Sequence, residues 1–385
     1  MHPALVALMV VLAAGPALGG GLAAAPADGT VTTGALSDDP VECEFPVEVE
    51  DATGETVIVE EEPEDVVVLA PSAAQHMWEI GAEDKVVGMP VNPFTAYLEG
   101  SEDRVNVVNQ DGEVDQEQVV GLEPDLVLAP NVIPEETVES LRDADQTVYR
   151  SPLANSVDDV YGEVETVGLL TGEFESAAQV TAEMQGQVDA IEAAVAEEEN
   201  PRVFYVLFGD TWTAGSNTLE NDIITRAGGE NIATASDEFE YFQISQEIIE
   251  EQDPEWLIIQ EGAEVPDIAP VQESTAVAND QIIEVDPNLI SQHGPRNVVP
   301  MTAMAEAFHP DAMADVDLDA VETPDPRQCL AAVEDETDDE AADEMADETD
   351  DDETDDAPAD DDGPGFTAAA VAVALAVVAL LARRQ

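Results

Sequence analysis

The sequence predicts an α/β protein with two lobes, each built around a mainly parallel sheet. Two runs of Val and Leu, residues 66–69 and 126–128, each end in a loop that contains proline. An apolar run bounded by turn residues is typical of a strand buried on both faces of a parallel sheet. Helix-like segments separate the strand-like ones, which is the pattern of βαβ units. An acidic-Pro-acidic turn precedes the run at 126–128 and also a run at 256–259, which indicates a second lobe of similar construction.

The first lobe is expected to extend over residues 43–154. Its short apolar segments, several of them followed by a helix-like segment, predict six strands. These strands are Glu55–Val59, Val66–Leu69, Val86–Gly88, Arg104–Val108, Leu126–Leu128 and Thr147–Tyr149. In open α/β sheets a ligand binds beyond the carboxyl ends of the strands, so the loops after these segments are candidates for a binding site.

Residues 155–199 predict a helical segment, from Ser156 to about Glu198, that contains one long, rigid connecting helix. Apolar residues recur in it at spacings of three and four, which places them on one face of a helix. They are Val180, Met184, Val188, Ile191 and Val195, and Pro201 follows as a stop. A single helix of this length predicts a stiff connection between the lobes.

The second lobe is expected over residues 200–330. Three apolar runs predict its buried strands, and three further segments predict helices. The strands are Val203–Phe208, Trp256–Gln260 and Gln281–Val285, and the helices are Asn221–Ala227, Glu247–Glu251 and Met301–Phe308.

The charge of the chain is extreme, with 88 Asp and Glu against 10 Lys and Arg and a formal net charge of −78. Residues 331–362 hold 19 of the acids, which leaves 69 elsewhere, so the acidity is not confined to a tail. Self-repulsion destabilises such a compact chain, whereas molar salt shortens the Debye length to about 3 Å. The composition predicts a halophilic protein. No nucleic-acid partner is expected, because there is no basic patch to neutralise phosphates.

The two ends of the chain predict export and attachment to a membrane. Residues 1–27 have the apolar stretch and small residues of a signal peptide. Residues 331–362 contain almost no large apolar residue and predict a disordered acidic linker. Residues 363–385 predict a short transmembrane helix whose terminal arginines lie in the cytoplasm. The expected location is the cell surface, anchored to the cytoplasmic membrane.

Cys43 and Cys329 are the two cysteines of the chain, one at each end of the predicted folded region. In an exported protein such a pair suggests a disulfide, and two unpaired buried thiols are the alternative. Neither cysteine has a His or second Cys at metal-ligand spacing, so no metal site is expected.

Several of these segments together resemble a known family. Residues 63–88, Leu122–Val127, Gly228–Asn231 and Gln243–Glu247 are similar, in order and spacing, to the solute-binding proteins of ABC importers for cobalamin and ferric siderophores. The match covers roughly residues 63–308. The resemblance implies a class III periplasmic-binding-protein fold, with two Rossmann-like lobes joined by one long rigid helix. It also implies a monomer that passes a small-molecule ligand to a permease dimer driven by ATPase subunits.

The resemblance extends to two surface features. Family members often carry a glutamate on each lobe that pairs with permease arginines, and the matching positions here are Gln75 and Glu247. Because Gln75 is not acidic, the first of these contacts departs from the family pattern. The C-terminal Pro364-Gly365-Phe366 resembles the haloarchaeal sorting signal (PGF-CTERM), which implies that the last helix is removed and replaced by a lipid.

The ligand is expected to be held by residues of the strand-end loops. Ser72 either caps a helix or contacts the ligand, and the aromatic residues either stack on a flat ligand or pack within their loops. Arg296 either meets a ligand carboxylate or phosphate or forms an ion pair that stabilises its lobe. The candidates are Pro71, Ser72, Phe94, Tyr97, Asn109, Asn131, Trp212, Tyr241, Phe242 and Arg296.

These features predict a solute-binding protein for cobalamin, with a ferric siderophore or haem as the alternative ligand. His293 is the one histidine we consider as an axial ligand to cobalt or iron, since His76 falls within a helix and His309 near a domain end. No cofactor is expected. A cell-surface hydrolase or a structural envelope protein is the distant alternative. No Gly-x-Ser-x-Gly, His-Glu-x-x-His or P-loop motif supports an enzyme.

Overall fold

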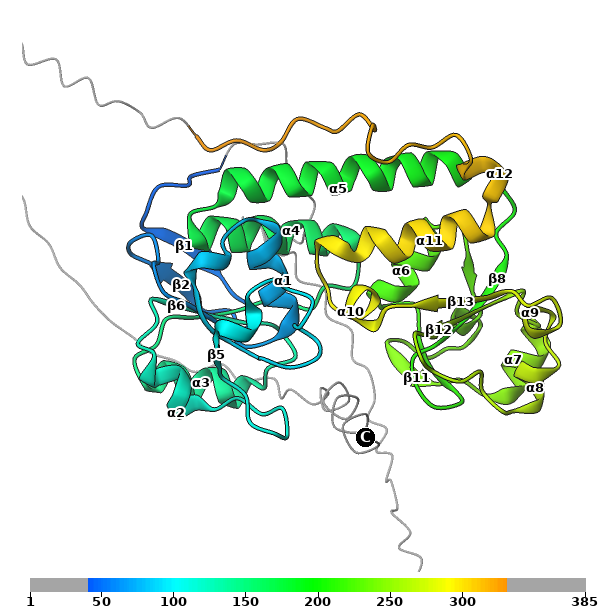
Figure 1. Ribbon diagram of the computed structural model, residues 1–385, viewed down its shortest axis with the longest axis horizontal. Helices are drawn as coiled ribbons and strands as arrows, with labels where there is room; N and C mark the ends of the chain where they lie inside the picture. Colours follow the sequence, from blue (N-terminus) through cyan, green and yellow to red (C-terminus); the bar gives the residue numbers. More distant parts are fainter. Residues whose placement is uncertain (1–40, 331–385) are drawn as a thin grey trace, which may run out of the picture. The chain divides into compact units, whose positions relative to one another are not determined.

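The computed structural model describes residues 41–330 and contains the two predicted lobes, each with a parallel sheet (Figure 1). The predicted signal peptide, acidic linker and C-terminal anchor, with its Pro364-Gly365-Phe366, lie outside the described residues. Within residues 41–330, no helix combines the length and the apolar character needed to cross a membrane.

The first lobe holds a five-stranded sheet in the order β5-β4-β3-β6-β7, with every neighbouring pair parallel. Chain order runs outward from the central β3 in both directions, as in a doubly wound sheet, so the topological switch point lies between β3 and β6. The strands are β3 (Val66–Val68), β4 (Val86–Met89), β5 (Val105–Asn106), β6 (Leu126–Ala129) and β7 (Val148–Arg150).

Three helices and a hairpin complete this lobe. The helices are α1 (Pro71–Glu79), α2 (Gln116–Gly121) and α3 (Glu135–Asp143). The predicted strand at residues 55–59 is β2 (Thr56–Val59), which pairs antiparallel with β1 (Val47–Glu50) and does not join the parallel sheet. The sequence analysis did not identify β1.

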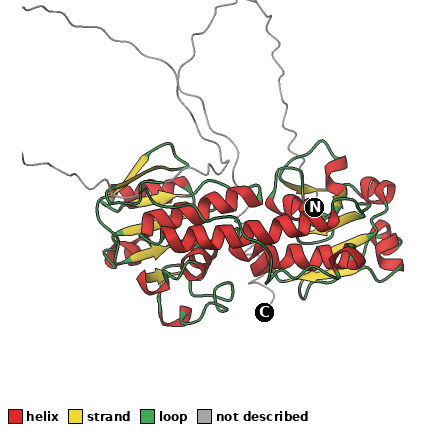
Figure 2. Ribbon diagram, turned by 90° about the horizontal axis from the view of Figure 1, so that it is seen from above, coloured by secondary structure: helices red, strands yellow, loops and turns green. Residues whose placement is uncertain are grey.

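The helical segment predicted over residues 156–198 consists of two helices, α4 (Val157–Thr171) and α5 (Phe174–Val195), and α5 is the long connecting helix. Gly172 ends α4 in the left-handed conformation, with φ of 81°, a geometry that favours glycine. The two helices pack side by side as a hairpin (Figure 1). The 22-residue α5 alone leads into the second lobe. Figure 2 shows helices between two separate groups of strands.

The second lobe contains a four-stranded parallel sheet in the order β10-β8-β12-β13, and β9 pairs antiparallel with β11 as a separate hairpin. The strands are β8 (Arg202–Val206), β9 (Trp212–Ala214), β10 (Glu230–Asn231), β11 (Tyr241–Gln243), β12 (Trp256–Gln260) and β13 (Ile282–Val285). The helices are α6 (Leu219–Arg226), α7 (Gln246–Gln252), α8 (Ala269–Gln272), α9 (Thr275–Ala278), α10 (Pro287–Ile290), α11 (Val298–Phe308) and α12 (Pro310–Met313), with a 3₁₀ turn η4 (Pro295–Asn297).

One apolar cluster runs through both lobes and the connecting helices. It includes Leu128 of β6, Val164 of α4, Ile191 of α5, Tyr205 of β8 and Met301 of α11, all almost fully buried. Two smaller clusters cover the other faces of the two sheets. Because the lobes share a continuous core through α4 and α5, the connection limits how far the lobes can move relative to each other.

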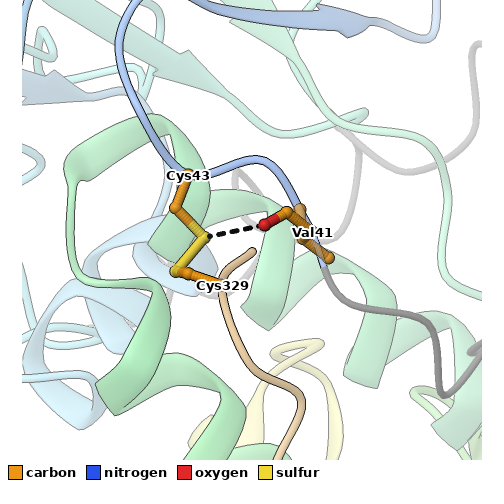
Figure 3. Close-up of a disulfide and its surroundings, with 3 residues drawn as sticks. All are labelled: Val41, Cys43 and Cys329. Carbon is orange, nitrogen blue, oxygen red and sulfur yellow. Dashed lines mark hydrogen bonds between the residues drawn. A yellow bond between two sulfur atoms is a disulfide. The ribbon is translucent and has the colours of Figure 1, made fainter. Parts of the chain in front are cut away.

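The segment after α12 returns along α5 to the first lobe (Figure 1). Gln187 of α5 donates its side-chain amide to the Leu318 carbonyl, and the backbone at Glu322 and Thr323 lies against Gly186. The segment ends at a disulfide between Cys43 and Cys329, with an S–S distance of 2.10 Å (Figure 3). The two cysteines of the chain are therefore joined to each other in the structure.

Candidate ligand-binding site

A cavity of about 70 Å³ lies where strand-end loops of the first lobe meet a loop of the second. The first lobe contributes the start of α1, the loops after β6 and β7, and α4, and the second lobe contributes the loop between α10 and η4. This position follows the rule for doubly wound sheets, since the loops after β3 and β6 flank the switch point. The lining residues are Ser72, His76, Pro130, Asn131, Val132, Ser151, Pro152, Leu153, Ala154, Val160, Glu163, Ser291 and His293.

Ser72 lines the cavity and does not cap the helix. The N-cap of α1 is Ala70, which makes no side-chain cap, and Pro71 occupies the first helical position. Pro is favoured there because it has no N–H to satisfy and its φ suits a helix. The expected N-cap role of Ser72 is therefore wrong, because the helix begins two residues earlier than that role requires. Asn131, at the end of β6, is the other predicted ligand-binding residue in the lining.

Two histidines share the cavity. His76 is 3 % exposed, and neither of its ring nitrogens has a hydrogen-bond partner within residues 41–330. Burial lowers the pKa of His76 to about 4, and burial likewise lowers the pKa of His293 to about 4. Both imidazoles are therefore neutral at neutral pH. The sequence analysis set His76 aside because it falls within a helix, but α1 presents it to the cavity.

His309 has a different role, since its Nε2 pairs with the Gly228 carbonyl at 3.0 Å. Within residues 41–330, no group of three or more His, Cys, Asp or Glu residues is arranged to hold a metal ion. The two cavity histidines could each offer one nitrogen to a metal that a ligand brings with it.

Glu163 of α4 is the acidic residue of the lining, and the sequence analysis missed it. Its carboxyl accepts hydrogen bonds from the Ser151 hydroxyl and from the Tyr149 hydroxyl, the latter at 3.2 Å. Burial raises the pKa of Glu163 to about 7, and the two hydrogen bonds oppose that rise. The sequence does contain a sign of this position. Glu163 follows the apolar Val160 by three residues, which places the two on the same side of a helix.

The aromatic residues predicted for the second lobe do not line the cavity. Trp212 starts β9 and stacks on Phe208, with ring centroids 5.1 Å apart. Tyr241 donates its hydroxyl proton to Glu220 at 2.9 Å, so it is directed into its own lobe. Phe242 packs against the second-lobe core. Neither Tyr241 nor Phe242 lines this cavity, and their place at the opposite wall of an opened site stays a prediction.

Tyr97 and Arg296 contact each other and do not line the cavity. The Tyr97 hydroxyl accepts a hydrogen bond from the Gln75 amide and donates one to the Gln292 amide oxygen, both at 2.9 Å. The Arg296 guanidinium lies 4.9 Å from the centroid of the Tyr97 ring and 3.8 Å from the Glu79 carboxylate. We call Gln75, Tyr97, Gln292 and Arg296 the inter-lobe clasp. Arg296 thus forms an ion pair, but with a residue of the first lobe and not within its own lobe.

The predicted permease contact at Gln75 is wrong, because its side chain is fully buried. It is held by Tyr97 and by the Arg296 backbone N–H, which donates to Gln75 Oε1 at 3.3 Å. Glu247 is exposed in the first turn of α7, so its docking role stays a prediction.

Two further predicted contacts have local structural roles. Asn109 lies on an exposed turn, where its side chain accepts from the backbone N–H groups of Asp111 and Glu113. Phe94 offers its carbonyl to the Gln292 amide at 2.9 Å and so supports the clasp. Neither residue lines the cavity.

Comparison with known proteins identifies the family. A family model described as periplasmic binding protein matches residues 66–289. A cobalamin-binding protein of Halobacterium salinarum is 42 % identical over 301 residues, which cover 73 % of this chain and 81 % of that protein. The uncharacterised ABC transporter substrate-binding lipoprotein YvrC of Bacillus subtilis is 28 % identical over 278 residues, covering 69 % and 87 %.

Solved structures show the same fold. The periplasmic vitamin B12-binding protein BtuF of Vibrio cholerae aligns with a TM-score of 0.57 at 21 % identity, over 64 % of this chain and 97 % of that one. The predicted class III fold is confirmed. This family consists of substrate-binding proteins that act outside the cytoplasm with an ABC permease and its ATPase. The chain described here belongs to the periplasmic binding protein family.

Proposed function

We propose that this protein captures cobalamin between its lobes and delivers it to the permease of an ABC importer. The observation that carries the proposal is the cavity at the switch point, where polar groups from both lobes converge and the buried His76 has no partner within the described residues. The 42 % identity to a halobacterial cobalamin-binding protein favours a corrinoid as the ligand.

Corrinoid binding requires the lobes to separate at the cavity. Pockets for drug-sized ligands measure about 300–1,000 Å³, whereas this cavity measures about 70 Å³. The clasp closes one side of the junction, because Gln292 bonds both Tyr97 and the Phe94 carbonyl. We therefore assign the lining residues to the floor of the ligand site. The walls form when the loops around Leu153 and Ser291 move apart.

A ferric chelate, either haem or a siderophore, is the second candidate ligand. The observation that favours haem is the pair of neutral imidazoles, His76 and His293, in one cavity. A neutral imidazole nitrogen binds iron and cobalt, and burial keeps both rings deprotonated. Axial ligation would give a low-spin haem spectrum that disappears when the ligating histidine is replaced.

The remaining parts of the proposal concern the ends of the chain. We propose that residues 1–27 direct export and that the C-terminal segment anchors the protein to the outer side of the cytoplasmic membrane, with lipid replacing the last helix. The acidic surface suits a monomer in molar salt. We propose no catalytic activity and no resident cofactor.

The test is calorimetric titration of the full chain in multimolar KCl with cyanocobalamin, a ferric hydroxamate and haemin. Saturable binding of cyanocobalamin that Ser72→Trp weakens would support the proposal, because the larger side chain fills the floor. Ser176→Trp, at an exposed position on α5, is the control. Binding of haemin alone, lost in His293→Ala, would support the second candidate. No heat with any of the three would contradict the solute-binding role.

A further inference from the structure

The charges around the cavity point to the kind of ligand that it accepts. Glu163 supplies a carboxyl group to the lining, and none of the Lys and Arg residues within residues 41–330 lies in it. A polyanionic ligand would therefore meet an acidic group with no cation to offset it.

The nearest candidate cations are held elsewhere. Arg150 precedes the lining residue Ser151, but its guanidinium donates to the backbone carbonyls of Asn131, at 3.1 Å, and Ile133, at 3.4 Å. Arg296 is engaged with Tyr97 and Glu79 in the clasp. Neither guanidinium is placed to receive a ligand carboxylate on the cavity floor.

The other polar groups of the lining carry no positive charge at neutral pH. The imidazoles are those of His76, on α1, and His293, before η4, and burial keeps the pKa of each near 4. The hydroxyls of Tyr149 and Ser151 hold the Glu163 carboxyl, and burial raises the pKa of Tyr149 well above its usual value. At about pH 8 the Glu163 carboxylate is therefore the charged group of the lining, and the site is negative.

We propose that Glu163 makes the site selective for neutral or cationic metal chelates, so that a corrinoid with amide side chains binds and one with carboxylates is rejected. This inference rests on the proposed function and deepens it. The amide groups of such a corrinoid can donate to the Glu163 carboxylate, which has two oxygens and accepts from only two described groups. A like charge at the floor of the cavity repels a carboxylate held against it, and salt screens a partly buried pair less than an exposed one.

The experiment compares ligands that share one ring and differ in charge. The full chain, in multimolar KCl at about pH 8, is titrated with dicyanocobinamide, which carries amides, and with dicyanocobyrinic acid, which carries carboxylates in their place. We expect the amide form to bind at least about tenfold more tightly. Glu163→Gln keeps the size of the side chain and one acceptor oxygen but removes the charge. In this variant the ratio of the two dissociation constants should fall by about tenfold.

Three comparisons keep the test decisive. Glu139→Gln removes one exposed charge from α3 of the same lobe and should leave the ratio unchanged. Ser151→Ala disturbs the same contact, and it removes a hydrogen bond that lowers the pKa of Glu163. It is therefore titrated at about pH 10, where the carboxylate is ionised again and the selectivity should be retained. A thermal melt in the same buffer shows that each variant is folded.

The outcomes separate this inference from the proposed function. Equal binding of both corrinoids by the wild type would overturn the inference and leave corrinoid capture standing, as would an unchanged ratio in Glu163→Gln. Loss of the ratio in Ser151→Ala to the same extent would also overturn it, because the role would then be positional. Failure to bind either corrinoid would contradict the proposed function itself.

Discussion

The Tyr97 hydroxyl of the first lobe donates a hydrogen bond of 2.9 Å to Gln292 of the second lobe, across a sequence separation of 195 residues. The same hydroxyl accepts from the buried Gln75, and Arg296 covers one face of the Tyr97 ring. Three side chains from two lobes thus meet at the Tyr97 phenol. The clasp fixes the closed position of the lobes beside the cavity.

Removal of that hydroxyl tests whether the clasp controls closure. Tyr97→Phe leaves the Gln75 and Gln292 amides each without one partner, so the free energy of unfolding should fall by about 1–3 kcal/mol. Ligand dissociation should become faster, because the closed state loses contacts that the open state does not have. Chemical denaturation and stopped-flow release of cyanocobalamin measure the two effects.

Tyr161→Phe is the matched control for the clasp. Tyr161 is buried in α4, and its hydroxyl forms no hydrogen bond with another described side chain. Its replacement should change the free energy of unfolding by less than about 0.5 kcal/mol and leave the release rate as it is. Equal release rates for Tyr97→Phe and the wild type would show that the clasp does not govern closure.

Two glycines of α4 should respond oppositely to alanine. A Cβ at Gly168 would lie 2.3 Å from the Ala177 Cβ of α5, so Gly168→Ala must push the helices of the hairpin apart. Overpacking of this kind costs about 1–3 kcal/mol. A Cβ at Gly162 meets no atom within 4 Å, so Gly162→Ala should add about 0.5–1 kcal/mol through helix propensity. Denaturant unfolding measures both changes in stability, as shifts of the midpoint at an unchanged m-value. A Gly168→Ala variant more stable than the wild type would contradict the close contact.

The lobes and sheets could be predicted because they depend on local patterns. The Val and Leu runs of β3, β6 and β12 are buried on both faces, so the sequence shows each of them as an uninterrupted apolar stretch. The break between α4 and α5 was missed because apolar residues continue on both sides of Gly172. A single glycine is tolerated within many helices, so it did not by itself indicate a turn.

The site was less predictable because it depends on which strand ends face one another. Ser72 and Asn131 follow the strands that flank the switch point, and a general rule finds them. Glu163 and His76 lie on helices, where sequence spacing does not reveal that both reach one cavity. Tyr97 and Arg296 had the right chemistry for a ligand, but partners from the other lobe occupy them.

The disulfide should contribute strongly to stability. It joins Cys43 to Cys329 across 286 residues, and the chain-entropy model gives upwards of about 4 kcal/mol for a closed loop of that length. Cys43→Ser with Cys329→Ser should lower the melting temperature in multimolar KCl, and a reductant should do the same to the wild type. Thiol titration of the denatured protein is the direct check. Two free thiols in unreduced protein would contradict the bond.

Glu220 should make stability depend on pH in a way that one substitution reveals. Its side chain is 2 % exposed, and burial raises its pKa from 4.5 to about 7, while the Tyr241 hydroxyl donates to it. The folded state thus favours the protonated carboxyl. This contribution is fully present below about pH 4.5 and is lost as the pH rises through about 7. Glu220→Gln cannot ionise, so it does not lose that contribution.

The free energy of unfolding of Glu220→Gln, minus that of the wild type, should therefore rise between about pH 4.5 and 7 and then level off. The rise should be on the order of 2–3 kcal/mol. The buried His76 and the half-buried His293 have pKa values lowered to about 4, so their contribution is lost as the pH falls from 6.5 through 4. That loss is common to both proteins, as is the effect of Glu163, and both cancel in the difference. Denaturation at matched KCl gives the curve, with the exposed Glu139→Gln as the control for net charge. A difference that stays flat across this range would mean that Glu220 is ionised in the folded protein well below pH 7.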